Sequence, residues 1–158
     1  MSNGEDLHEI SLREMLSPET VKSRRFVSSW EEAVEEAGTL LLAAGKIRAE
    51  YVGAMKRVLQ EMGPYAVIAP GIVLLHARPE DGVVSPCIAI ITLDKPVEFG
   101  HSENDPVDIV IAFGAIDKKA HVAALRALAE MLGDEHYLRR IRTAQTDSEL
   151  YHALVGEG

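Results

Sequence analysis

Three aliphatic runs in the middle of the chain constrain the fold more than any other feature: AVIAPGIVLLHA (66–77), CIAIITL (87–93) and VDIVIAFGAI (107–116). Each contains a stretch of strand length, and Pro and Gly turns separate them. Their apolar residues continue almost without alternation, which is typical of strands covered on both faces. The pattern predicts a central sheet of three buried strands, with a further short strand at 66–68.

Two segments with helical spacing precede these runs. Ser29 and Glu32 have the spacing of a capping box, and the apolar residues that follow recur at helical intervals over 29–44. A second helix is expected over 48–62, where Gly63 and Pro64 end it. Its apolar face is predicted to comprise Tyr51, Ala54, Met55, Val58, Leu59 and Met62.

Helical spacing returns after the third run. Asp117 has the position of an N-cap for a helix that ends at Gly133, and two shorter helices are expected over 135–142 and 148–154. Before the first helix, residues 1–28 carry only scattered apolar positions interrupted by Pro18, and we expect a weakly ordered or docking segment there.

Helices before and after one group of strands define the expected fold class. It is an α/β fold, a three-layer α/β/α sandwich with a central mixed sheet. A length of 158 residues suits one domain with its own core, so we expect a single domain over 1–158, with 1–10 flexible.

Composition excludes several classes of function. The chain carries 25 acidic and 16 basic side chains, and its formal net charge of −9 would repel a phosphate backbone, so nucleic acid is not an expected partner. No segment resembles a signal peptide or a membrane span, so we expect a cytoplasmic protein without direct membrane insertion. The single cysteine, Cys87, has aliphatic neighbours and is expected to be a buried free thiol.

His76 is the first candidate for chemistry, because it follows an aliphatic run directly and precedes a polar turn at 78–82. A neutral imidazole is nucleophilic near neutral pH and can accept a phosphoryl group without a neighbouring base. Arg78 and the turn's N–H groups can donate to phosphoryl oxygens. His121 falls near the start of the helix after Asp117, where an anion is stabilised.

Taken alone, these residues also fit a structural role. A histidine at a strand end is more often satisfied within the fold than catalytic, and Arg78 is more often a surface charge. The other histidines are scattered, without HExxH or CxxC spacing, so no metal is expected. GxSxG, GxGxxG and GxxxxGK[ST] do not occur, so neither a serine hydrolase nor a nucleotide cofactor is expected.

The stretch GPYAVIAPGIVLLHARPEDGV (63–83) resembles the active-site segment of enzyme IIA domains of the phosphotransferase system (PTS), in the mannitol/fructose superfamily and its ascorbate-type branch. SWEEAVEEAGTLL, YVGAM and PVEFGHSENDPVDIVIAFGAIDKKAHVAALRALAEML follow the order and spacing of such domains. The resemblance covers most of the chain and implies the mannitol-specific IIA-like (type-2) fold.

This resemblance also implies a function. His76 matches the phosphorylated nucleophile and His121 matches a second histidine that stabilises the phosphoryl group, with Arg78 as a further phosphoryl-oxygen donor. Such a domain takes a phosphoryl group from the histidine-containing phosphocarrier protein and passes it to a cysteine of the cognate IIB domain. That transfer energises uptake of ascorbate or a related sugar or sugar alcohol through the membrane transporter IIC, and it requires no cofactor or metal.

Two positions depart from the family pattern. Leu75 replaces the proline that usually precedes the active histidine. Val58 lies where the mannitol and fructose branches have an arginine, and the adjacent Arg57 is expected to point elsewhere, since neighbours on a helix are about 100° apart. Two alternatives therefore stay open: a regulatory module of the same fold whose phosphorylation state is read by another protein, and a relative in which His76 is inert.

Overall fold

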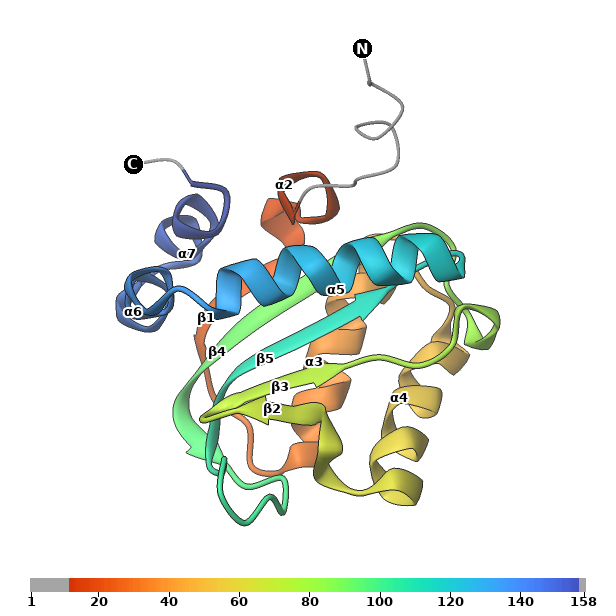
Figure 1. Cartoon of the computed structure of the whole chain (residues 1–158), viewed down its shortest axis with the longest axis horizontal. Coiled ribbons are helices and arrows are strands. Elements are labelled where there is room, and N and C mark those ends of the chain that lie inside the picture. Colours follow the sequence, from red (N-terminus) through yellow and green to blue (C-terminus); the bar gives the residue numbers. More distant parts are fainter. Residues whose placement is uncertain (1–11, 157–158) are drawn as a thin grey trace.

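A computed structural model describes residues 12–156, so the expectation for residues 1–10 lies outside the described residues. The chain forms one mixed five-stranded sheet with strand order β1-β4-β5-β3-β2 (Figure 1). Its strands are β1 (Val21–Arg25), β2 (Val67–Ala69), β3 (Ile72–Leu75), β4 (Cys87–Val97) and β5 (Val107–Gly114).

The central strands are those predicted from the aliphatic runs. β4 and β5 pair antiparallel, whereas β3 runs parallel to β5, with Leu75 opposite Ala112. The short strand expected at 66–68 is β2, which pairs antiparallel with β3. Parallel pairing of β3 with β5 brings the ends of both strands to the same edge of the sheet.

Helices cover both faces of this sheet, as predicted. α3 (Trp30–Ala43) and α4 (Ala49–Met62) lie on one face, while α5 (Lys118–Leu132) crosses the other (Figure 1). That second face is also covered by α2 (Leu12–Met15), α6 (Glu135–Thr143) and α7 (Asp147–Leu154).

The two faces of the sheet bury separate cores. In β4, Ala89 and Ile91 pack toward α3 and α4, whereas Ile88 and Ile90 pack toward α5. Because alternate side chains of a strand point to opposite faces, a strand covered on both must be apolar at every position. Cys87 at the start of β4 is fully buried, as expected, and burial raises the pKa of its thiol to about 11.

Local capping explains where the helices begin. The Ser29 hydroxyl accepts a hydrogen bond from Glu32 N, but the Glu32 carboxylate accepts from Ser28 N and Oγ, so the second half of the predicted capping box is shifted by one residue. Met62, predicted on the buried face, is 61% exposed. It is the last residue of α4, and Gly63, with φ of 82°, turns the chain away there.

The segment before Ser29 is more ordered than its sequence predicts. After a 3-10 turn, η1 (Pro18–Thr20), the chain forms β1, an edge strand parallel to β4 with Val21 fully buried. The prediction was wrong because β1 is short and largely polar, and a register shift interrupts its pairing. Its backbone is held partly by side chains, since Ser23 N donates to the carboxylate of Asp147.

Candidate functional site

His76 directly follows β3, where the parallel strands β3 and β5 end. Its ring is half-buried, and Nδ1 lies 3.3 Å from the carbonyl oxygen of Leu74. A carbonyl oxygen only accepts hydrogen bonds, so this contact favours the tautomer that carries its proton on Nδ1. Nε2 then keeps its lone pair, which makes it the nucleophilic nitrogen.

The structure brings His121 next to His76. His121 lies in the first turn of α5, whose N-cap Asp117 accepts a hydrogen bond from Ala120 N through its side chain. The two imidazole centroids are 5.4 Å apart and their planes meet at 63°. The end of β3 and the start of α5 therefore present two imidazoles to one small region.

Phe113 packs against both imidazoles, and sequence reasoning missed it. Its ring centroid is 5.0 Å from that of His76 and 5.2 Å from that of His121. Phe113 is fully buried near the end of β5. Burial lowers the pKa of His76, and His121 lowers it further, so His76 stays neutral to a lower pH than an exposed histidine would.

Arg78 faces acidic groups of its own turn. The guanidinium Nε lies 3.8 Å from Glu80 and 3.6 Å from Asp81, and Arg78 N donates to the Asp81 carboxylate. The turn η3 (Pro79–Asp81) also uses its own N–H groups, since Asp81 N donates to Arg78 O and Gly82 N to Pro79 O. The N–H groups of Arg78, Asp81 and Gly82 are therefore already engaged within the turn, and their donation to phosphoryl oxygens stays a prediction.

Tyr51 is a second functional candidate that the sequence did not reveal. Sequence spacing placed it on the core face of α4, where it is fully buried. Its hydroxyl accepts a hydrogen bond from Ala77 N at 2.9 Å and donates one to Phe113 O at 2.8 Å. The Tyr51 hydroxyl thus links Ala77, which follows His76, to Phe113, whose ring contacts both histidines.

The position of the missing family arginine is apolar here. Val58 is half-buried and packs against the core on the α3 and α4 side, whereas Arg57 is exposed. Three apolar side chains in segments that adjoin the site along the chain reach the surface. Val84 follows η3, Ile116 follows β5 and Val122 adjoins His121, and they are 53%, 50% and 49% exposed.

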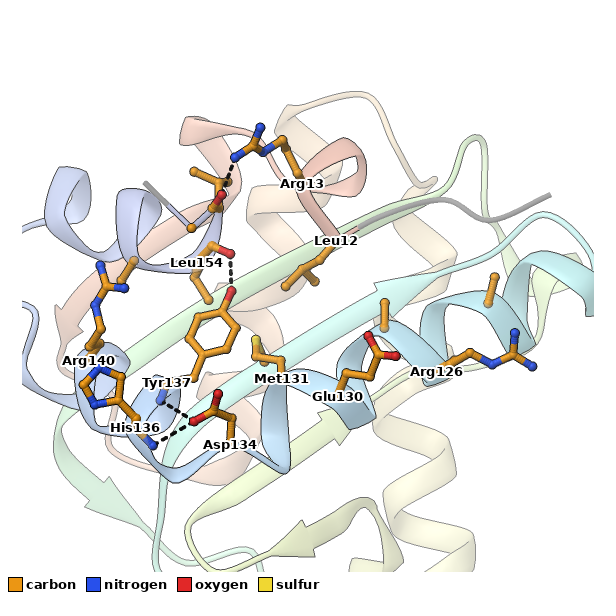
Figure 2. A pocket seen from close by; sticks show the side chains of 15 residues that line it. Leu12, Arg13, Arg126, Glu130, Met131, Asp134, His136, Tyr137, Arg140 and Leu154 are labelled. Carbon is orange, nitrogen blue, oxygen red and sulfur yellow. Dashed lines mark hydrogen bonds between the residues drawn. The ribbon is translucent and has the colours of Figure 1, made fainter. Parts of the chain in front are cut away.

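A cavity lies elsewhere in the molecule. It has a volume of about 810 Å³ and is lined by residues of α2, α5, α6 and α7, without His76 or His121 (Figure 2). The Tyr137 hydroxyl donates to Leu154 O beside it, and the Asp134 carboxylate accepts from His136 N and Tyr137 N.

Among residues 12–156, no group of three or more His, Cys, Asp or Glu side chains is placed to hold a metal ion. No helix in this described range has both the length and the apolar character needed to cross a membrane.

Comparison with known proteins identifies the family. The model of the family "Phosphoenolpyruvate-dependent sugar phosphotransferase system, EIIA 2" matches residues 14–156, and the chain belongs to this family. It is 35% identical over 143 residues to the ascorbate-specific PTS system EIIA component of Escherichia coli K12, covering 89% of this chain and 93% of the relative. The corresponding protein of Salmonella typhi is 36% identical over the same length.

Solved structures confirm the fold class. The mannitol-specific cryptic phosphotransferase enzyme IIA CmtB from E. coli superposes with a TM-score of 0.83 at 28% identity, over 92% of this chain and 98% of that one. Enzyme IIAMTL of E. coli, in its complex with phosphorylated enzyme IIBMTL, superposes with a TM-score of 0.77 at 26% identity, over 90% and 98%. The resemblance inferred from residues 63–83 is thereby confirmed.

Proposed function

We propose that this protein is a histidine phosphocarrier that receives a phosphoryl group on Nε2 of His76. The donor is the histidine-containing phosphocarrier protein and the acceptor is a cysteine of a IIB domain. The observation that carries the proposal is the pair of adjacent imidazoles, His76 and His121, at the strand ends of a chain in the EIIA 2 family. The similarity to ascorbate-specific relatives supports a transport system for ascorbate or a related sugar or sugar alcohol, with IIC as its membrane component.

The hydrogen bond to the Leu74 carbonyl oxygen leaves Nε2 of His76 as the ring nitrogen that attacks phosphorus. The Nε2 lone pair attacks phosphorus, so a new P–N bond forms as the P–N bond of the donor histidine breaks. The His76 ring then keeps Nδ1–H and gains positive character, which the Leu74 carbonyl stabilises. When the IIB thiolate attacks phosphorus in turn, the P–N bond breaks and neutral His76 is restored.

His121 supplies the complementary interaction. A bound phosphoryl group adds about 1.5 to 2 negative charges, which require donors around the oxygens. The His121 ring lies 5.4 Å from that of His76, centroid to centroid, and we propose that one of its ring N–H groups donates to a phosphoryl oxygen. Arg78 is a second proposed donor, and it would exchange its contacts with Glu80 and Asp81 for the phosphoryl group.

Partner docking is proposed over the surface around the two histidines. Val84, Ile116 and Val122 supply exposed apolar area there, and the cores of protein interfaces are enriched in such area. We place all of this on a single IIA domain in the cytoplasm. The alternative regulatory module would use the same phosphorylation but would not pass the group to IIB.

Intact-mass analysis tests the proposal in two stages. The protein is incubated with phosphoenolpyruvate, enzyme I and the phosphocarrier protein, and then chased with a IIB domain from the same organism. We expect a gain of one acid-labile phosphoryl group that is lost on the chase.

Matched histidine variants locate the acceptor. His76→Gln should abolish the gain, His121→Gln should slow it, and His136→Gln, on the distant helix α6, should leave it unchanged. A stable phosphoryl group that IIB does not remove would favour the regulatory module. Wild-type protein that takes up no phosphoryl group would contradict the proposal.

A further inference from the structure

The Tyr51 hydroxyl connects three segments of the site. It extends from α4, accepts from Ala77 N and donates to Phe113 O, with Ala77 O a longer 3.3 Å away. Ala77 follows β3 and Phe113 lies in β5, so the phenol bridges the two parallel strands at the edge where they end. Tyr51 is fully buried, so both hydrogen bonds form away from water.

These bonds constrain the backbone next to His76. The Ala77 amide is one peptide bond from His76, and the Phe113 carbonyl belongs to the residue whose ring contacts both imidazoles. Without the hydroxyl, a buried N–H and a buried C=O would lose their partner, and leaving such groups unpaired is costly. The backbone would move to satisfy them, and the His76 ring would move with it.

The start of α4 also holds the turn after His76. Arg48 N donates to Gly82 O at 2.7 Å, and a Cβ added to Gly82 would lie 3.2 Å from the Cβ of Tyr51. Gly82 has a φ of 134°, a conformation that favours glycine. The polar turn therefore packs closely over Tyr51, and the anchoring of Ala77 is part of a larger contact.

The two hydrogen bonds of the Tyr51 hydroxyl do not change with pH in the physiological range. Burial raises the pKa of Tyr51 well above its ordinary value, so the hydroxyl retains its proton throughout the physiological range. Because Phe113 O can only accept and Ala77 N can only donate, the direction of both hydrogen bonds is fixed.

We infer that Tyr51 is a positioning residue for phosphoryl transfer. Through Ala77 N and Phe113 O it holds the His76 ring with Nδ1–H on Leu74 O and Nε2 unprotonated, ready for attack. The inference rests on the proposed function, because His76 must be the acceptor for its orientation to affect the rate.

The test compares Tyr51→Phe with Tyr137→Phe. Each variant removes one tyrosine hydroxyl that makes a hydrogen bond to the backbone. The Tyr137 hydroxyl, however, donates to Leu154 O on the opposite face of the sheet, beside the cavity in Figure 2. The first readout is the His76 tautomer of the unphosphorylated protein, from long-range nitrogen–proton correlations of the imidazole. The second is the single-turnover rate of transfer from the phosphorylated carrier at varied carrier concentration.

For Tyr51→Phe we expect a mixture of His76 tautomers and a transfer rate at saturating carrier about tenfold lower, with half-saturation unchanged. Tyr137→Phe should match the wild type in both readouts. A folded Tyr51→Phe protein with the wild-type tautomer and rate would overturn the inference. A changed tautomer in a protein whose wild type accepts no phosphoryl group would support positioning and contradict the proposed function.

A second variant keeps the test decisive if Tyr51→Phe does not fold. Site-specific 3,5-difluorotyrosine at position 51 keeps the ring and the hydroxyl but makes the oxygen a weaker acceptor for Ala77 N–H. The expected shift in the His76 tautomer has the same direction. An unchanged tautomer in that protein would overturn the inference.

Discussion

The N-cap of α5 couples helix stability to the position of His121. The Asp117 carboxylate accepts from Ala120 N at 2.8 Å, and the Asp117 carbonyl accepts from His121 N at 3.0 Å. Asp117→Ala removes the side-chain cap, which costs about 1 kcal/mol, with measured caps spanning roughly 0.5 to 2. For a chain of this size that corresponds to a fall in Tm of about 2–4 °C. Fraying of the first turn should also displace His121 and slow phosphoryl transfer.

Two further variants serve as controls. One tests whether slower transfer follows lost stability alone, and the other tests whether it follows the lost charge of Asp117. Asp134 caps α6 by accepting from His136 N and Tyr137 N, so Asp134→Ala should lower Tm by a similar amount while transfer to His76 stays unchanged. Asp117→Asn keeps a side-chain oxygen that can cap the helix but removes the charge. It should retain both the wild-type Tm and the wild-type transfer rate.

Thermal unfolding followed by circular dichroism gives the stability, and single-turnover transfer from the phosphorylated carrier gives the function. Asp117→Ala with lowered Tm but wild-type transfer would refute the reasoning, because the first turn of α5 would then have no role in placing His121. Equal slowing in Asp134→Ala would refute it too, since the effect would follow stability and not position.

Three other predictions concern the surroundings of the site and the sheet. Burial first, and His121 second, lower the pKa of His76, so the unfolded chain binds a proton before the native state does. The stability that comes from this pKa difference is present above the unfolded pKa of about 6.5 and is lost as pH falls below it. His76→Gln should therefore make the free energy of unfolding, measured by urea titration, decline less steeply on acidification. Cys87, with its pKa near 11, should not react with a thiol reagent in the native protein at about pH 8 and should react once the chain is denatured. Gly71→Ala should lower the free energy of unfolding, measured with urea, by about 1–3 kcal/mol. The backbone φ there is 78°, and the new Cβ would lie 2.6 Å from Arg142 Nη2 and 2.7 Å from Asp108 Oδ1. Wild-type stability in this variant would contradict the prediction.

The sequence predicts the core of the fold because strands buried on both faces leave unbroken apolar runs and the helices that cover them leave a helical period. β3, residues 87–93 of β4 and most of β5 are apolar, and the long helices repeat at helical spacing. β1 leaves no such trace, since an edge strand of five residues, VKSRR, needs few apolar side chains. Only tertiary contacts identify it as a strand: Val21 pairs with Ile90 of β4, and the amide of Ser23 donates to Asp147, 124 residues further along the chain.

The site follows from the topology more than from local pattern. His76 and His121 are each visible in the sequence, but their proximity depends on the parallel pairing of β3 with β5, which sets the end of β3 beside the start of α5. A local pattern does not specify which strands pair. The resemblance to PTS enzyme IIA domains carried that information, because the family fixes the topology.

Tyr51 shows why a buried residue can carry function that spacing hides. Its position on the apolar face of α4 predicts only packing, and the hydroxyl gains its role from two strand ends that fold across it. The departure at Leu75 makes this role more important. Proline before the active histidine would fix φ within the strand, whereas Leu75 leaves that torsion free in the unfolded chain. Here the backbone around His76 is held from the following residue instead, through Ala77 and Tyr51, so the restraint that a proline would give locally comes from the tertiary fold.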